Sequence, residues 1–458
     1  MQKSFAMAAL LAASCGAQAA SDADLAAIRA QIDDMKRTYE QRIAALEQRL
    51  VQAESRVGEP AASAPSAPAP ITAESRPSAA GPNAFNPEIS LILQGQYRHA
   101  RNVPGRGITG FVPGGDGLNT RGFSVDETEL VLAANIDPYW RGQAIVAMAD
   151  GQASIEEAWF QSLAIGQGVG LKVGRFRSSI GYLNEQHPHM WDFADAPLIY
   201  QAMFGEDASY VQDGVQLKWL APTALFVELG AEVGRGANFP GTDRNNNGTG
   251  GGALYVHLGD DVGVSNSWRA GASWLKTRAS ERSSDFVDSN DVTAQGAFAG
   301  DSTTWLADFV WKWAPNGNSA HQNFKFQSEY FVREEQGGLN CSSQDPTSVC
   351  ATSVGSSYKT RQSGWYAQGV YQFTPQWRAG LRYEQLDSGT RDFGLNAANL
   401  VVDSYRPKKA SAMVDYSWSE FSRVRLQVAQ DKSMLGITDH QLTLQYVMSL
   451  GAHGAHKF

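Results

Sequence analysis

The chain has 458 residues and a formal net charge of −9, which leaves room for a folded domain and additional segments. This acidic excess argues against a nucleic-acid-binding protein, which needs a basic face for the phosphate backbone. Mean hydropathy is −0.32, and no apolar run long enough for a membrane-spanning helix follows the first twenty residues. A transmembrane β-barrel is not excluded, since every second residue of its strands faces the lumen.

Residues 1–20 have the pattern of a secretory signal peptide, with a positive start at Lys3, an apolar core, and small residues before a cleavage site. Cys15 leaves a second interpretation open, that of a lipid-acceptor cysteine, although Ala12 stands where such sites usually have leucine. The pattern favours the signal peptide, and hence export from the cytoplasm.

Residues 21–57 predict a coiled-coil helix. Apolar residues recur every three or four positions from Leu25 to Val57, with one stutter between Tyr39 and Ile43. A single helix with so narrow a stripe cannot bury it alone, so we expect partner helices, most simply copies of the same chain. The alternative is docking against the rim of the chain's own folded domain.

Residues 58–84 hold six prolines among alanines and serines, and predict a semi-extended linker.

Residues 85–458 are the expected folded domain. Apolar and polar residues alternate there in sixteen stretches, a pattern typical of strands with one apolar and one polar face. The stretches lie at residues 89–98, 122–136, 139–149, 154–163, 169–178, 213–221, 223–234, 251–258, 266–278, 303–313, 322–333, 362–373, 377–386, 408–418, 421–431 and 438–450.

The last stretch shows the alternation most clearly. Apolar residues occupy the even positions from Leu442 to Leu450, and the odd positions are polar except for Val447. A soluble β-sandwich has the same alternation. Here the strand runs on to a chain end at Phe458, and a terminal aromatic in this position resembles the recognition signal of bacterial outer-membrane β-barrel proteins.

The connections between stretches also alternate in length. Short ones lie at residues 137–138, 221–223, 374–376 and 419–420, and long ones at 99–121, 179–212, 235–250, 279–302, 334–361 and 387–407. Six tryptophans stand within four residues of the short-turn rim, where a membrane–water interface suits them: Trp140, Trp219, Trp268, Trp313, Trp377 and Trp418. These patterns predict an all-β fold, a transmembrane antiparallel β-barrel of about 16 strands in outer-membrane lipid.

Two short sequences, Ile-Glu-Glu-Ala-Trp-Phe at 155–160 and Leu-Lys-Val-Gly-Arg-Phe at 171–176, resemble the phosphate-selective (O/P-type) porin superfamily. Residues 181–193, 234–236 and 239–241 look closer to a subgroup described as zinc-regulated outer-membrane porins or receptors. The resemblance implies a homotrimeric sixteen-stranded barrel in the bacterial outer membrane, with the coiled coil in the periplasm. It implies passage of small solutes or ions through the barrel.

Phosphate-selective porins attract anions with many arginines and lysines in the lumen. In this sequence, lumen-type positions carry charges of both signs. They include Arg98, Lys172, Lys218, Asp308, Lys312, Lys325, Glu329 and Arg333. This mixture, in an acidic chain, does not predict phosphate selectivity.

The connection at 179–212 is the best candidate for a pore constriction, since porins commonly fold such a loop into the barrel. The expected constriction residues are Glu185, His187, His189, Asp192 and Asp195. Pro188 biases His187 toward an extended conformation, so both histidines are expected to project the same way and, with these carboxylates, to bind Zn²⁺. The alternative is a loop packed by its own aromatic side chains, with hydrogen-bonded histidines.

Other candidate sites are weaker. Cys341 and Cys350 lie nine residues apart in a Gly/Ser-rich stretch and are expected to form a disulfide that pins a loop. His453 and His456 differ in strand parity, so a regular strand projects them to opposite faces. Residues 243–248 begin like a calcium loop, but the twelfth position is leucine where glutamate is required.

A channel for small hydrophilic solutes or ions, with a link to zinc acquisition, is the leading hypothesis. No cofactor is expected apart from zinc at the two histidines. A receptor for a metal or metal chelate is the alternative, although residues 21–84 offer a helix and a linker rather than a plug domain. An enzyme is disfavoured because no catalytic motif is present. A further alternative is a structural tether, in which the coiled coil makes the connection and the barrel serves as its anchor.

The coiled-coil hypothesis makes a prediction about assembly. Ile28→Asp combined with Leu46→Asp places charges in the apolar stripe, and it should weaken self-association of the periplasmic segment. Analytical ultracentrifugation and circular dichroism of a peptide with residues 21–57 provide the measurement. A peptide that stays monomeric and unfolded at high concentration would contradict the hypothesis.

Overall fold

The structure is a computed structural model and describes residues 87–111, 120–149, 151–205, 207–243, 245, 247–401 and 404–451. The predicted signal peptide, coiled coil and linker lie outside these residues, as do His453, His456 and Phe458. The chain divides into two units, Met1–Ala79 and Ala80–Phe458, and every described residue belongs to the second. Among the described residues, no helix is both long enough and apolar enough to cross a membrane.

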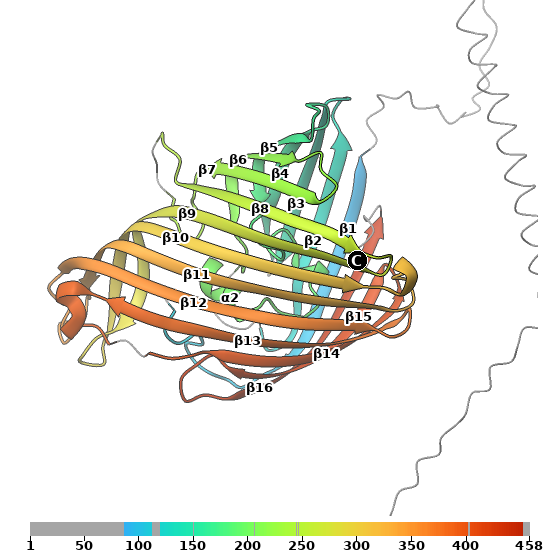
Figure 1. The fold of residues 1–458 in the computed structure, drawn as a ribbon. Helices are drawn as coiled ribbons and strands as arrows, with labels where there is room; N and C mark the ends of the chain where they lie inside the picture. The colour runs from blue at the N-terminus through green and yellow to red at the C-terminus, as the bar shows by residue number, and fades with distance from the viewer. Residues whose placement is uncertain are drawn as a thin grey trace, which may run out of the picture. The chain divides into compact units, whose positions relative to one another are not determined.

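The second unit is a closed barrel of sixteen antiparallel strands, in which sequence neighbours pair and β1 pairs with β16 (Figure 1). The strands are β1 (Glu88–His99), β2 (Gly122–Asn135), β3 (Trp140–Ala149), β4 (Gln152–Ser162), β5 (Val169–Arg177), β6 (Val211–Leu220), β7 (Phe226–Gly234), β8 (Gly251–Val262), β9 (Asn266–Val287), β10 (Thr293–Trp313), β11 (Asn323–Ser342), β12 (Val354–Gln372), β13 (Trp377–Asp392), β14 (Lys408–Ser419), β15 (Ser422–Lys432) and β16 (Asp439–Gly451). The predicted sixteen-stranded antiparallel barrel is confirmed.

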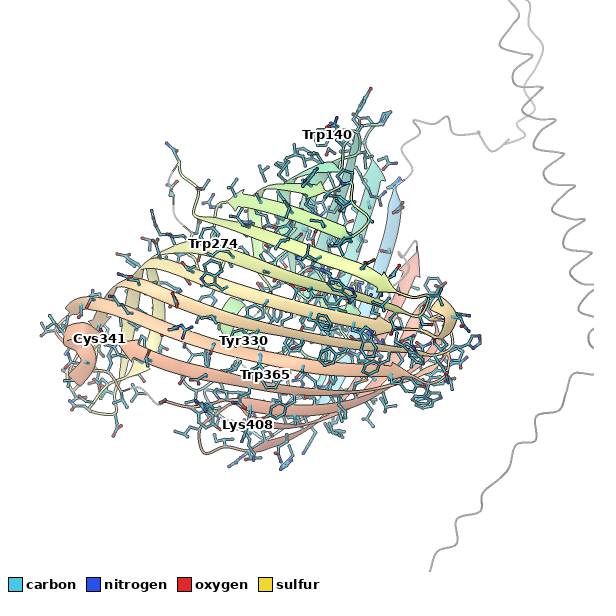
Figure 2. All side chains as sticks on the ribbon, in the orientation of Figure 1. Trp140, Trp274, Tyr330, Cys341, Trp365 and Lys408 are labelled. Atoms are coloured by element: carbon cyan, nitrogen blue, oxygen red, sulfur yellow. A yellow bond between two sulfur atoms is a disulfide. The ribbon has the colours of Figure 1, made fainter. Side chains whose placement is uncertain are left out.

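Side chains alternate between an apolar outer face and an inner face that is mainly polar. On β16, the even residues from Leu442 to Leu450 are 39–55% exposed on the outside, whereas the odd residues from Asp439 to Val447 are buried. Aromatic side chains such as Trp274, Tyr330 and Trp365 lie on the outer surface (Figure 2). An apolar outer band suits lipid, and barrel closure pairs the backbone groups that an open sheet edge would expose there.

Strands β9 to β13 extend far beyond the predicted stretches. The connection between β9 and β10 is only residues 288–292, so the prediction of a long loop at 279–302 is wrong. Much of 334–361 and part of 387–407 likewise belong to strands. The outer face of β11 shows why, because it changes from Val332 to the polar Glu334 and Gln336 while the pairing with β12 continues. Beyond the apolar band, the alternation of polarity ends but the backbone ladder does not.

Two short 3-10 helices and a disulfide lie among the connections that follow these strands. They are η2 (Pro315–Gly317), η3 (Gly394–Ala398) and the bond between Cys341 and Cys350, whose Cα atoms are 5.6 Å apart. Both sulfur atoms are buried in a cluster with Phe286, Phe298 and Phe393. The disulfide therefore links the end of β11 to the connection at residues 343–353, and it belongs to a separate apolar cluster.

Because the apolar band covers only part of the outer surface, a substitution to arginine should affect stability differently inside the band and beyond it. Leu444→Arg puts a charge in the apolar band and should lower the free energy of unfolding by about 2–4 kcal/mol. Gln336→Arg lies on the outer face of β11 beyond this band, and it should change the same quantity by less than about 0.5 kcal/mol. Urea unfolding in lipid vesicles, followed by tryptophan fluorescence, provides the measurement. Equal losses for the two variants would contradict this placement of the lipid band.

Candidate functional site

The connection from β5 to β6 lies inside the barrel, and its described residues, 178–205 and 207–210, are called the inserted segment. They include η1 (Pro188–Met190) and α2 (Leu198–Phe204), and α2 is visible behind the front wall in Figure 1. The segment contacts strands from opposite parts of the wall, including β2 through Glu129, β11 through Glu329 and β14 through Lys409. Such contacts are possible only from within the lumen.

Hydrogen bonds hold the two ends of the inserted segment side by side. The backbone N–H of Ser178 donates to the carbonyl of Tyr210 at 2.9 Å. The side chain of Asn184 donates to the carbonyl of Ser178 at 2.7 Å and accepts from the N–H of Tyr210 at 2.7 Å. Glu232 of β7 accepts from the Ser178 hydroxyl at 2.6 Å and from the N–H of Ser179 at 2.9 Å. The segment therefore enters and leaves the barrel wall at one place.

The apolar side of the segment packs against the wall formed by β8 to β13. Tyr200 and Phe204 of α2 contact Phe331 of β11, with ring centroids 5.1 Å and 6.0 Å away. Inward-facing Leu306 and Tyr366 belong to the same buried cluster. Apolar residues at these lumen positions therefore provide a docking surface for α2.

Asp192 and Asp195 fix the segment through buried ion pairs with β11, β13 and β14. Asp192 lies 2.6 Å from Lys325 Nζ and 3.2 Å from Arg378 Nη1. Asp195 pairs with Lys409, and its Oδ1 lies 2.6 Å from Arg382 Nη2. Both aspartates are at most 9% exposed. They anchor the segment and do not line the open part of the lumen.

These ion pairs keep the two aspartates charged. Burial raises the pKa of Asp192, but Lys325 and Arg378 outweigh it and lower that pKa to about 2. Burial likewise raises the pKa of Asp195, and Lys409 more than compensates, so this pKa lies well below its ordinary value. Because both values are depressed on folding, the ion pairs stabilise docking fully above about pH 4. The contribution is lost as the pH falls through the depressed values.

The predicted lumen charges all lie on the inner face or at its rim, and several contact the inserted segment. Glu329 accepts from the N–H groups of Tyr182 and Leu183, at 2.6 Å and 3.0 Å. Lys218 lies 3.1 Å from Glu185. The others on the inner face are Arg98, Lys172, Asp308, Lys312, Lys325 and Arg333. Much of the charge expected to face solutes therefore holds the segment in place.

His187 and His189 both turn toward β2, where their rings stack with centroids 5.9 Å apart. His189 Nδ1 lies 2.8 Å from Glu129 Oε1, and His187 Nδ1 lies 3.3 Å from Glu129 Oε2. His187 is also 2.9 Å from Glu156 and 3.1 Å from Glu157, through Nδ1 and Nε2 respectively. The carboxylates near the histidines are thus Glu129, Glu156 and Glu157, and the expected partnership with Glu185, Asp192 and Asp195 is wrong.

A β-bulge explains why two consecutive glutamates reach the same site. Ile145 of β3 pairs with Glu157 and Val146 pairs with Ile155, so Glu156 is the extra residue on β4. A regular strand would send Glu156 and Glu157 to opposite faces. Periodicity alone therefore misses Glu156, although the unusual Glu-Glu pair inside an alternating stretch was a signal for it.

The electrostatics of His187 depend on this acidic group. Burial lowers the pKa of His187 and Arg177 lowers it further, but Glu129, Glu156 and Glu157 raise it to about 10. The carboxylates therefore favour a positive charge at the imidazole.

A cavity of about 500 Å³ remains between the wall of β1 to β5 and the inserted segment. Glu185, His187 and His189 line it from the segment. The charged residues that line it from the wall are Glu88, Glu129, Arg141, Glu157, Lys172 and Arg177. Three of the five predicted constriction residues therefore face this open space.

The anchoring role of Asp195 is testable by proteolysis. Asp195→Asn removes the charge that pairs with buried Lys409, and the loss should weaken docking by about 3 kcal/mol. Chymotrypsin should then cut the segment near Trp191 or Tyr200 at least tenfold faster than in the unmodified protein. Asp213→Asn is the control, because its pair with Arg175 is exposed and contributes about 0–1 kcal/mol. Unchanged digestion of the Asp195 variant would contradict the anchor.

No family model matches the chain. Similar solved structures include OmpT of Vibrio cholerae, with 11% identity, a TM-score of 0.49, and coverage of 81% of this chain and 99% of that chain. The channel DcaP of Acinetobacter baumannii has 13% identity, a TM-score of 0.46, and coverage of 81% and 99%. OprB of Pseudomonas putida has 12% identity, a TM-score of 0.45, and coverage of 80% and 94%. Likenesses at this level carry no functional argument.

One curated relative is similar in sequence as well. An uncharacterized protein of Aquifex aeolicus (strain VF5) is 31% identical over 413 residues, which span 82% of this chain and 80% of the relative. The chain belongs to the same family as this Aquifex aeolicus protein.

Proposed function

We propose that the protein is a channel of the bacterial outer membrane, through which small hydrophilic solutes or ions diffuse. The observation that carries this proposal is the cavity of about 500 Å³ beside the inserted segment, inside a closed barrel with an apolar outer band. A barrel of sixteen strands is wide enough for an aqueous lumen. The inserted segment narrows that lumen to a passage along β1 to β5.

The lining of the passage supports weak rather than strong ion selectivity. Its charges have both signs, and Glu88 lies 2.7 Å from Arg141 at one part of the wall. Glu185 is likewise matched by Lys218, 3.1 Å away. Charges in a confined passage act on ions more strongly than they would in open water. Lys172, which lies over the ring of Trp159 at 4.8 Å, is a cation on this lining.

We also propose a homotrimer, because the apolar stripe of residues 21–57 needs partner helices and the resemblance is to trimeric porins. The mixed charges of the lining do not favour phosphate selectivity. No observation among the described residues favours a receptor for a metal chelate over a channel. A receptor predicts tight binding and no steady current, so one experiment separates the two functions.

Planar-bilayer recording of the purified protein tests the channel. We expect ohmic current with a reversal potential close to zero in a salt gradient. Lys172→Glu should shift that potential toward cation selectivity, because it reverses a charge on the passage. Lys408→Glu makes the same change on the outer face of β14 and should leave the potential unchanged (Figure 2).

The outcomes have distinct meanings. Absence of current from correctly folded protein would overturn the channel. Current that is insensitive to Lys172→Glu would place the passage elsewhere in the barrel.

A further inference from the structure

The group formed by Glu129, Glu156 and His187 contains three buried ligand atoms that have no hydrogen-bond partner outside the group among the described residues. They are Glu129 Oε2, Glu156 Oε2 and His187 Nδ1, and all three lie within 4.8 Å of one another. Glu129 is 1% exposed and His187 is 7% exposed. Burying two carboxylate oxygens against an imidazole nitrogen is costly unless a positive charge lies between them.

The other atoms of these three side chains have partners that orient them. His189 Nδ1 lies 2.8 Å from Glu129 Oε1, and His187 Nε2 lies 3.1 Å from Glu157 Oε1. Arg177 Nη2 donates to Glu156 Oε1 at 3.1 Å. When Nε2–H of a neutral His187 donates to Glu157, its Nδ1 lone pair points toward the two free oxygens. Outer partners of this kind fix the ligands of metal sites and set the tautomer of a metal-binding histidine.

We propose that Glu129, Glu156 and His187 bind a divalent transition-metal ion, for which zinc is the best match, in the wall of the lumen. One imidazole nitrogen and two carboxylate oxygens form a donor set that zinc accepts. Two ligands around a tetrahedral zinc, each about 2.0–2.1 Å from the metal, lie about 3.3 Å apart. His187 Nδ1 is 3.3 Å from Glu129 Oε2 and 2.9 Å from Glu156 Oε2, so small movements suffice.

The position of the site gives the metal a route of entry and predicts an effect on the current. Glu129, His187 and His189 line the cavity beside the inserted segment, so an ion reaches the site from this cavity. A bound dication also ties the inserted segment, through His187, to β2 and β4. If the protein conducts as proposed above, zinc in this position should reduce the current, because it adds charge to the narrowed lumen.

Direct metal binding tests the site without any transport measurement. Purified full-length protein is titrated with Zn²⁺ in competition with a chromophoric chelator, and Co²⁺ is used for its visible absorption. We expect about one strong site per chain. Glu156→Gln and His187→Gln should each weaken Zn²⁺ binding at least tenfold, and should alter the Co²⁺ spectrum.

His257→Gln is the matched control for these variants. His257 is also a buried lumen histidine beside a glutamate, with Nδ1 3.0 Å from Glu228 Oε1, but it lies outside the three-ligand group. Its substitution should leave Zn²⁺ binding unchanged. Far-UV circular dichroism and heat-modifiable migration verify that each barrel is folded, and Glu156→Gln changes only one atom type on a partly exposed side chain.

Four results would overturn the site. They are no Zn²⁺ binding by the folded protein at micromolar concentration, binding unchanged in His187→Gln, equal loss in His257→Gln, and loss only when His453 and His456 are replaced. The first means that a proton alone supplies the positive charge. Bilayer current without zinc binding would keep the channel and reject the metal site, and zinc binding without current would do the reverse.

Discussion

Closure of the sheet is the constraint on which the rest of the molecule depends. β1 and β16 pair over ten residues of each strand, from Ser90 opposite Gly451 to His99 opposite Leu442, and so leave no free edge. An open edge in lipid would expose backbone groups that nothing there can bind. Closure also creates an inner face out of contact with lipid, so polar and charged residues are stable along it. The charged anchors, the histidines and the cavity all occupy that inner face.

The inserted segment binds the wall of the lumen through two kinds of contact. It builds an apolar core around Tyr200 and Phe331 against β8 to β13, and Asp192 and Asp195 form buried ion pairs with β11, β13 and β14. On the side of β1 to β5 the segment touches the wall through His187 and His189, and open space remains beside these contacts. The position of the cavity thus follows from where the segment contacts the wall.

Much of the barrel was predictable from the sequence, because lipid outside and water or polar groups inside impose a period of two. That reasoning located all sixteen strands and the connection that enters the lumen. It failed where the constraint is absent, as in β9 to β13 beyond the apolar band, and where the period is broken, as at Glu156. The partners of Asp192, Asp195 and His187 could not be predicted either. Each pairing depends on which strands the closed barrel places around the inserted segment, and local sequence does not show this.

The anchors of the inserted segment have a consequence for the order of folding. Asp195 follows β5, yet Lys409 comes 214 residues later and Gln427 comes 232 residues later. Contacts between residues so far apart in the chain are slow to form, because the entropy of closing the intervening loop must be overcome first. The contacts of Asp195 with Lys409 and Gln427 therefore form only once β14 and β15 have joined the sheet. We expect these buried contacts to complete folding rather than to begin it.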